Sequence, residues 1–169
     1  MARILIVAGG CRGRRLASEM TGAGHVVRMT TRVEAHRAAI EATGAECWIG
    51  APDRLATLRG ALETVTLACW LLGSASGSAQ EVRALHCSRL EAFLRQLIDT
   101  TVRGFIYEAA GTRVAAADLA AGERIARSLG ERNEIPVATL MADPHHVDAW
   151  LAEAGAAIRS LLEPSRSGQ

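Results

Sequence analysis

The fold of this chain is decided by residues 3–16, which read RILIVAGGCRGRRL. An apolar run of strand length passes directly into a glycine-rich turn and then into a segment of helical character. Glycines permit a tight turn and a close backbone approach, and the start of a helix offers unpaired amides to a pyrophosphate. Gly9, Gly10 and Gly13 fit these tasks, so the stretch predicts a strand, a dinucleotide-binding turn and a helix.

The glycine pattern departs from the usual GxGxxG form, because the third glycine would fall near Leu16 and is missing. The prediction of a dinucleotide-binding turn therefore depends more on the position of the turn between a strand and a helix than on the glycine pattern. The alternative is a plain tight turn of an α/β protein that binds no ligand.

Apolar runs and helical stretches alternate along the rest of the chain, which is typical of a parallel sheet covered by helices on both faces. We expect six strands, because the runs are continuously apolar, as strands buried on both faces are. We also expect one domain over residues 1–163 and a disordered polar tail over 164–169. The expected strands cover 3–8, 25–31, 46–49, 66–72, 103–107 and 136–140, and the expected helices cover 13–23, 34–43, 53–62, 79–99, 116–132 and 147–162.

The charge composition excludes several kinds of chemistry. The 169 residues carry 19 basic and 18 acidic side chains, for a net charge of +1, so nucleic acids and membrane surfaces are disfavoured as partners. Every basic residue is arginine, a bias that a GC-rich genome can also produce. A chain without lysine has no lysine base, no Schiff-base lysine and no phosphate-loop lysine.

No segment reads as an export signal, and no apolar stretch approaches the roughly 20 residues of a membrane helix, so we expect a cytoplasmic protein. Cys11, Cys47, Cys69 and Cys87 are widely spaced and form no CxxC pair, so we expect free thiols, mostly buried, and no metal site. The helix expected over 79–99 holds more apolar residues than one buried stripe requires, which is compatible with a homodimer.

The end of the second expected strand bears on the choice of cofactor. Arg32 follows Thr30 and Thr31 about 20 residues beyond the glycine turn, where NAD-specific domains place an acidic residue. Its guanidinium can pair with the 2′-phosphate of NADP, and Arg12 could reach the same phosphate. These residues favour NADP over NAD. The alternative for Arg32 is a solvated surface arginine.

The glycine turn over 9–13, the strand ending at Arg32, the turn over 50–58 and the strand over 104–107 resemble an atypical short-chain dehydrogenase/reductase. The resemblance is to the extended epimerase/dehydratase-like and NmrA-like branches, and it covers nearly the whole chain. It implies an α/β Rossmann fold in three layers, with a parallel sheet of order 3-2-1-4-5-6 and a nucleotide across the carboxyl ends of the strands. The cofactor-binding residues expected on this basis are Gly9, Gly10, Cys11, Arg12, Gly13, Thr31, Arg32, Leu72, Gly73, Ser74, Ala109 and Ala110.

Three departures from that family limit the reaction. An Asp near adenine is usual after the third strand, and Asp53 either takes that place or, as we favour, caps the helix expected at 53–62. The fifth strand lacks the family's substrate-binding serines. The catalytic Tyr-x-x-x-Lys pair is missing from the next helix, and Tyr107, the one tyrosine of the chain, is expected to be a core residue. The standard proton relay is therefore excluded.

No catalytic residue is assigned among the remaining candidates. Glu108, near the end of the fifth strand, is either a buried carboxyl with a raised pKa or a carboxylate in water. Cys11, beside several arginines, is either redox-sensitive or an inert buried thiol. His145 and His146 either contact a ligand or belong to a turn at the start of a helix.

Two functions of different classes follow from these observations. The first is an NADP-dependent oxidoreductase that acts on a small substrate by positioning alone. The second is a non-catalytic NADP-binding sensor that regulates a partner protein. A nucleotide-binding or nucleotide-sugar-binding fold without redox function is a third and weaker candidate.

Overall fold

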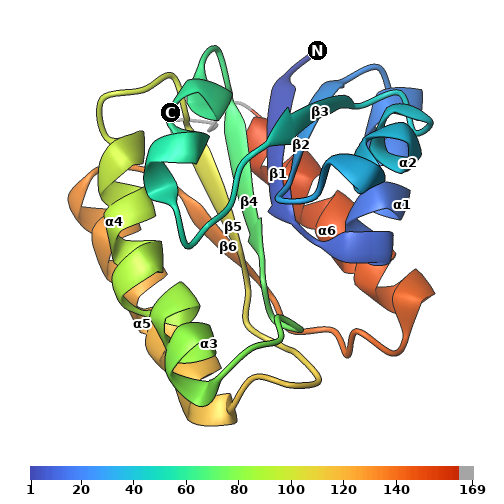
Figure 1. The fold of residues 1–169 in the computed structure, drawn as a ribbon. Coiled ribbons are helices and arrows are strands. Elements are labelled where there is room, and N and C mark those ends of the chain that lie inside the picture. Colours follow the sequence, from blue (N-terminus) through green and yellow to red (C-terminus); the bar gives the residue numbers. More distant parts are fainter. Residues whose placement is uncertain (164–169) are drawn as a thin grey trace.

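Six parallel strands form one sheet in the order β3-β2-β1-β4-β5-β6 in the computed structural model, which describes residues 1–163 (Figure 1). The predicted α/β fold class and sheet order are confirmed, and each strand begins and ends within one residue of its predicted bounds. The predicted tail over 164–169 lies outside the described residues. The strands are β1 (Arg3–Ala8), β2 (Val26–Thr31), β3 (Glu46–Ile49), β4 (Leu67–Leu71), β5 (Gly104–Glu108) and β6 (Val137–Leu140).

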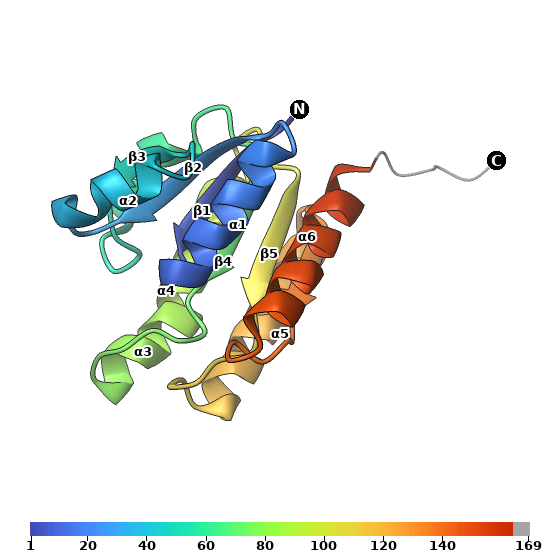
Figure 2. The ribbon, with the colours of Figure 1, turned by 90° about the vertical axis from the view of Figure 1, so that its right-hand side faces the viewer.

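Helices cover both faces of the sheet, as predicted. Successive side chains of a strand point to opposite faces, and in β1 Ile4 and Ile6 join the core beneath α1 and α6, whereas Leu5 and Val7 join the core beneath α3, α4 and α5. Figure 2 shows α1 and α6 side by side on their face. The helices are α1 (Gly10–Gly22), α2 (Arg37–Glu41), α3 (Ala79–His86), α4 (Ser88–Leu97), α5 (Ala116–Arg132) and α6 (Val147–Leu162).

The helices α5 and α6 have their predicted bounds, but the helix predicted over 53–62 is wrong. Two 3₁₀ turns, Leu55–Leu58 and Gly60–Leu62, replace it. The indole of Trp48 donates to the carbonyl oxygen of Thr57 at 2.7 Å, so this carbonyl is engaged by β3. A Cβ at Gly60 would lie 2.9 Å from the same indole, so Trp48 packs where a continuous helix with side chains would lie.

The helix predicted over 79–99 is interrupted at Cys87, which has φ −125° and ψ −93°. The interruption separates α3 from α4 next to a fully buried His86. Apolar side chains of both helices pack against this chain's own sheet, which accounts for most of the apolar surplus seen in the sequence. The helix predicted over 34–43 is likewise divided into a 3₁₀ turn, Glu34–His36, and the short α2.

Tyr107 is a core residue, as predicted. It is fully buried in β5, and its hydroxyl lies 2.7 Å from Nδ1 of His86. His86 Nε2 lies 3.0 Å from the carbonyl oxygen of Leu72, to which it donates. Burial lowers the pKa of His86, so the ring is neutral and Nδ1 accepts from the Tyr107 hydroxyl at the shorter distance, while the Leu119 carbonyl oxygen lies 3.2 Å from the same hydroxyl. A Cβ at Gly122 would lie 2.1 Å from this hydroxyl, so α5 approaches closely only because it has a glycine there.

Candidate functional site

The turn between β1 and α1 has the tight form that the sequence predicts. Gly9 has φ +94°, a conformation that favours glycine, and a Cβ there would lie 2.9 Å from the Cα of Gly13. The Gly13 amide donates to the Gly9 carbonyl at 2.9 Å, and α1 begins at Gly10. The first amides of a 13-residue helix are thereby exposed at the carboxyl end of the sheet, where open α/β sheets bind ligands.

A cavity of about 440 Å³ opens beside this turn, at the carboxyl ends of β1 and β2. Its volume is within the range of small-molecule sites. Predicted cofactor residues Gly10, Thr31, Arg32 and Leu72 line it. Met29, Ile40, Pro52 and Leu85 give it apolar walls, and Arg14 and His36, which the sequence analysis did not select, give it basic groups.

A second cavity, of about 380 Å³, lies at the other end of the sheet. It is lined by Ile135, Pro136 and Val137 at the amino end of β6, together with Arg127 and Gly130 of α5. It contains neither the glycine turn nor a strand carboxyl end. The cavity beside the β1–α1 turn is therefore the candidate site.

Arg32 forms a two-point ion pair with Asp53 at the rim of the candidate site. The guanidinium nitrogens lie 3.1 Å and 3.4 Å from the two carboxylate oxygens, and both side chains are about half exposed. The helix-capping role favoured for Asp53 is wrong, because the 3₁₀ turn starts at Leu55 with no side-chain cap. Asp53 instead lies at the edge of the site, which is closer to the alternative role of an Asp near the adenine.

Arg14 is the basic group that the sequence analysis missed. It lies one helical turn after Gly10 and lines the same cavity as Arg32. Its guanidinium donates to the Cys11 sulfur at 3.1 Å, and within residues 1–163 it forms no ion pair with a carboxylate. Its spacing from Gly10 is the sequence signal that could have identified it.

Arg12 does not line the cavity that Arg32 lines, and its expected contact with the same phosphate stays a prediction. Its guanidinium lies 3.3 Å from the Ser74 hydroxyl, 3.6 Å from the Glu108 carboxylate and 5.4 Å from the centre of the Trp150 ring. Residues two apart on a helix point about 200° apart. Arg12 and Arg14 therefore face opposite sides of α1, and only Arg14 faces the cavity.

Glu108 is a buried carboxyl, and the alternative of a carboxylate in water is wrong. Its side chain is fully buried. One oxygen accepts from the Gly73 amide at 2.7 Å and the other from the Trp150 indole at 2.8 Å. Burial raises the pKa of Glu108, and the charge of Arg12 opposes that rise. The carboxyl thus ties the loop after β4 to α6.

The loops after β4 and β5 press against each other. A Cβ at Gly111 would lie 1.5 Å from the Gly73 carbonyl oxygen, and one at Gly73 would lie 2.0 Å from the Ala110 carbonyl oxygen. The hydroxyls of Thr112 and Ser74 lie 3.3 Å apart. Predicted site residues Gly73, Ser74 and Ala110 are thus brought together, and Ala109 is buried beside them.

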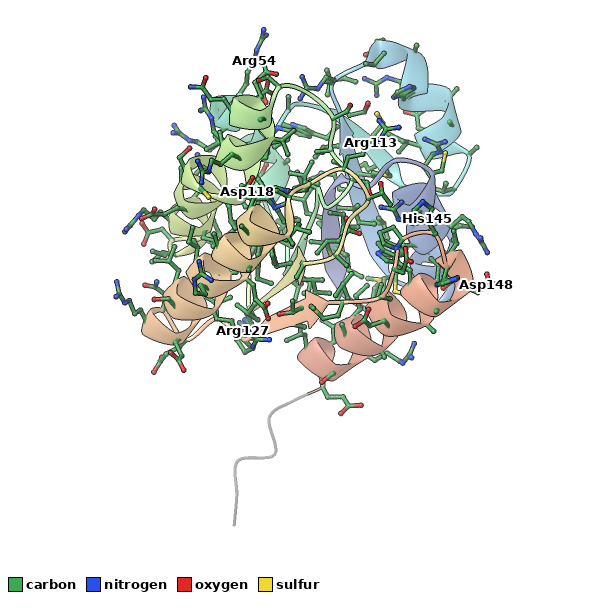
Figure 3. The ribbon with its side chains drawn as sticks, turned by 90° about the horizontal axis from the view of Figure 1, so that it is seen from below. Arg54, Arg113, Asp118, Arg127, His145 and Asp148 are labelled. Atoms are coloured by element: carbon green, nitrogen blue, oxygen red, sulfur yellow. The ribbon has the colours of Figure 1, made fainter. Side chains whose placement is uncertain are left out.

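The remaining candidates lie apart from these contacts. His145 and His146 are exposed beside Asp143, at 3.1 Å and 3.9 Å, within one turn after β6. Figure 3 looks onto this end of the molecule and shows His145 at the surface near α6. Within residues 1–163 no group of three His, Cys, Asp or Glu side chains is placed to hold a metal.

The four cysteines are free, as expected, but most are not fully buried. Cys69 is buried, and burial raises its pKa to about 12. Cys47 and Cys87 are half-buried, and Cys11 is exposed in the glycine turn. The expectation of mostly buried thiols is therefore wrong, because Cys11 lies on the solvent side of α1.

No protein-family model and no curated protein matches this sequence. Solved structures match its fold. Vestitone reductase from alfalfa (Medicago sativa) superposes with a TM-score of 0.64 at 16% identity, over 83% of this chain and 56% of the reductase. UDP-glucuronic acid 4-epimerase from Bacillus cereus, solved with NAD, gives 0.64 at 13% identity, over 81% of this chain and 54% of the epimerase.

UDP-glucose 4-epimerase from Thermotoga maritima, solved with UDP-glucose, gives a TM-score of 0.66 at 9% identity, over 81% of this chain and 54% of the epimerase. The chain thus spans about half the length of these proteins. Identities this low show a shared fold. The chain has the Rossmann fold of NAD-dependent epimerases and reductases, in agreement with the resemblance noted in the sequence.

Proposed function

We propose that this protein binds NADP, with the adenosine in the cavity beside the β1–α1 turn and the pyrophosphate against the first amides of α1. The observation that carries the proposal is the convergence of Arg14, Arg32 and the start of α1 on one cavity. Two guanidiniums and a helix N-terminus favour an anionic ligand. Met29 and Ile40 supply the apolar wall that a nucleobase needs.

The preference for NADP over NAD depends on whether the positive charges of Arg14 and Arg32 are already neutralised by carboxylates. Asp53 already neutralises part of the charge of Arg32, and a carboxylate there could also accept hydrogen bonds from the ribose of NAD. Within residues 1–163 Arg14 has no carboxylate partner, and it is half-buried at the cavity. A 2′-phosphate placed between the two arginines could pair with the guanidinium of Arg14, which no carboxylate among residues 1–163 neutralises. This arrangement favours NADP.

The missing Tyr-Lys pair and the structural engagement of Tyr107 and Glu108 favour a sensor over an enzyme. The hydroxyl of Tyr107 is bound to His86 in the core, the chain has no lysine, and Glu108 is buried with its oxygens bound to Gly73 and Trp150. We therefore propose that NADP occupancy is read by a partner protein. An oxidoreductase acting on a small substrate by positioning alone is the second candidate, favoured by the fold shared with vestitone reductase.

Titration of NADPH and NADH against the wild type and three variants tests the proposal. Arg32→Asp and Arg14→Ala should each weaken NADPH about tenfold or more and NADH no more than about threefold, because a charge-assisted pair to the 2′-phosphate is lost. Arg15→Ala is the matched control, since Arg15 is an α1 arginine that pairs with exposed Asp148. Equal losses for both cofactors would remove the 2′-phosphate assignment, and no binding by the wild type would remove the function.

A screen for NADPH oxidation with quinones, flavins and small carbonyl compounds separates the sensor from the oxidoreductase. Turnover above the uncatalysed rate with any of them would favour the second candidate. Binding without turnover would favour the sensor, whose partner is then sought with NADP-loaded protein.

The expected homodimer and the expected cytoplasmic location remain predictions. Ile98, the residue that follows α4, is an exposed apolar side chain in the stretch expected to cover a partner, at 43%. Light scattering coupled to size exclusion tests the homodimer, which a monomer mass would contradict. No helix within residues 1–163 is long and apolar enough to cross a membrane.

A further inference from the structure

The cavity of the candidate site lies along only one half of the edge formed by the carboxyl ends of the strands. A Rossmann sheet consists of two mononucleotide-binding halves, one on each side of the point where the strand order reverses. In this sheet that point lies between β1 and β4. The residues that line the cavity come from β1, β2, α1, α2, α3 and the loops after β2, β3 and β4, and none lies beyond Leu85.

Arg12 lies at the other half of the edge. Its side chain is about 20% exposed and lies over the indole of Trp150, with hydrogen-bond and charge contacts to Ser74 and Glu108. These partners come from α6, the loop after β4 and the end of β5. Arg12 thus crosses the crevice in front of the second half of the sheet.

The loops beneath Arg12 are closed as well. The contact between Gly73 and Gly111 leaves no room for a side chain, and the Ser74 and Thr112 hydroxyls bridge the same two loops. Glu108 anchors the first of these loops through the Gly73 amide. Opening this half would require moving a buried charge pair and separating two loops in backbone contact.

We propose that the site recognises the adenosine 2′-phosphate half of NADP alone, and that Arg12 is the specificity-determining residue that keeps the nicotinamide half out of the crevice. This inference rests on the proposed function. The nicotinamide then projects into solvent, so NADP⁺, NADPH and adenosine 2′,5′-bisphosphate share one set of contacts. A sensor of this kind responds to the amount of the cofactor and is blind to its redox state.

The wild-type protein allows a direct test by calorimetric titration. NADP⁺, NADPH and adenosine 2′,5′-bisphosphate should bind with dissociation constants within about threefold of one another, and nicotinamide mononucleotide should not compete. If NADP⁺ or NADPH binds more than about thirtyfold tighter than the bisphosphate, the inference is overturned and the proposed function stands. If none of the three binds, the proposed function fails, and the inference fails with it.

An Arg12→Ala variant tests the residue itself, with Arg15→Ala as the matched arginine control on the same helix. Arg12→Ala should improve NADP⁺ relative to the bisphosphate by about tenfold, because the second half becomes open, while Arg15→Ala should leave the ratio unchanged. An unchanged ratio in folded Arg12→Ala contradicts the role of Arg12. Melting curves show whether the variant is folded, since Glu108 loses its counter-charge.

Nicotinamide fluorescence gives a second readout that does not depend on the variant. Among the described residues, Arg12 Nε is buried and has no hydrogen-bond partner. The competing outcome is therefore that the Arg12 side chain moves out of the crevice when the cofactor binds. Emission of NADPH bound to the wild type should equal that of free NADPH, because a solvated ring is not shielded. Enhanced emission would mean that the ring enters the protein, and the inference would be wrong.

Discussion

At the scale of single residues, Glu108 is a carboxyl held away from water in the interior of the protein. Burial raises its pKa above 4.5, and Arg12, Trp150 and the Gly73 amide partly offset that rise. A carboxyl in this place has a structural task, because it joins β5 to α6 and to the loop after β4. Its titration should therefore appear in the stability of the protein.

The variant Glu108→Gln should change how stability depends on pH. Between pH 4.5 and the raised pKa, the folded state binds more protons at Glu108 than the unfolded state does, so this carboxyl lowers the free energy of unfolding as pH rises. Relative to the variant, the wild type should lose stability as the pH rises from the ordinary pKa of the carboxyl in the unfolded state to its raised pKa in the folded state. Urea unfolding at several pH values measures this, and parallel curves for the two proteins would contradict it.

Gly111 shows how strictly a close backbone approach limits one position. Its added Cβ would overlap the Gly73 carbonyl oxygen, so Gly111→Ala should reduce the free energy of unfolding by about 1–3 kcal/mol. Gly22→Ala is the control, since nothing lies within 4 Å of a Cβ there. Equal stability of both variants in urea unfolding would show that the two loops are not in contact.

At the scale of elements, the interruption between α3 and α4 and the pair of His86 with Tyr107 belong together. His86 is the last residue of α3, and its ring joins the Leu72 carbonyl at the end of β4 to the Tyr107 hydroxyl in β5. A continuous helix over 79–99 is what the apolar pattern predicts. The buried imidazole and the dihedral angles of Cys87 end α3 at His86, although the apolar pattern continues to Ile98.

Tyr107→Phe tests whether this tyrosine serves the core alone. Loss of the hydroxyl leaves a buried imidazole nitrogen without its partner, so the free energy of unfolding should fall by about 1–2 kcal/mol. NADPH affinity should not change, because Tyr107 does not line the cavity. A variant with full stability and lost NADPH binding would place the hydroxyl in the functional site.

At the scale of the whole molecule, binding at the carboxyl edge should stabilise the fold. The cavity connects β1, β2, α1, α2 and the loops after β3 and β4, so a bound nucleotide holds together elements that are distant in sequence. NADP at a concentration one hundred times its dissociation constant should add about 2.7 kcal/mol to the free energy of unfolding. Thermal melting with increasing NADP measures this, Arg32→Asp should reduce the effect, and an unchanged melting temperature in the wild type would contradict binding.

The strands and the turn between β1 and α1 could be predicted from the sequence, whereas the sheet order was implied only by the family resemblance. Continuous apolar runs identify buried strands, and the glycines of the turn permit a tight backbone conformation that involves only residues next to them in the sequence. The absence of lysine and the strand position of Tyr107 were also readable, because they need no knowledge of partners. These features depend on residues close together along the chain.

The pairing of side chains across the carboxyl edge became known from the folded structure. Arg32 pairs with Asp53, and Arg12 contacts Glu108. Arg14, and not Arg12, lines the cavity. Local pattern places a residue on a helix or strand, but its partner is chosen by packing between segments that lie far apart along the chain. The rotation of α1 about its axis is set by burial of Leu16 and its neighbours against the sheet, and that rotation decides which arginine serves the cavity.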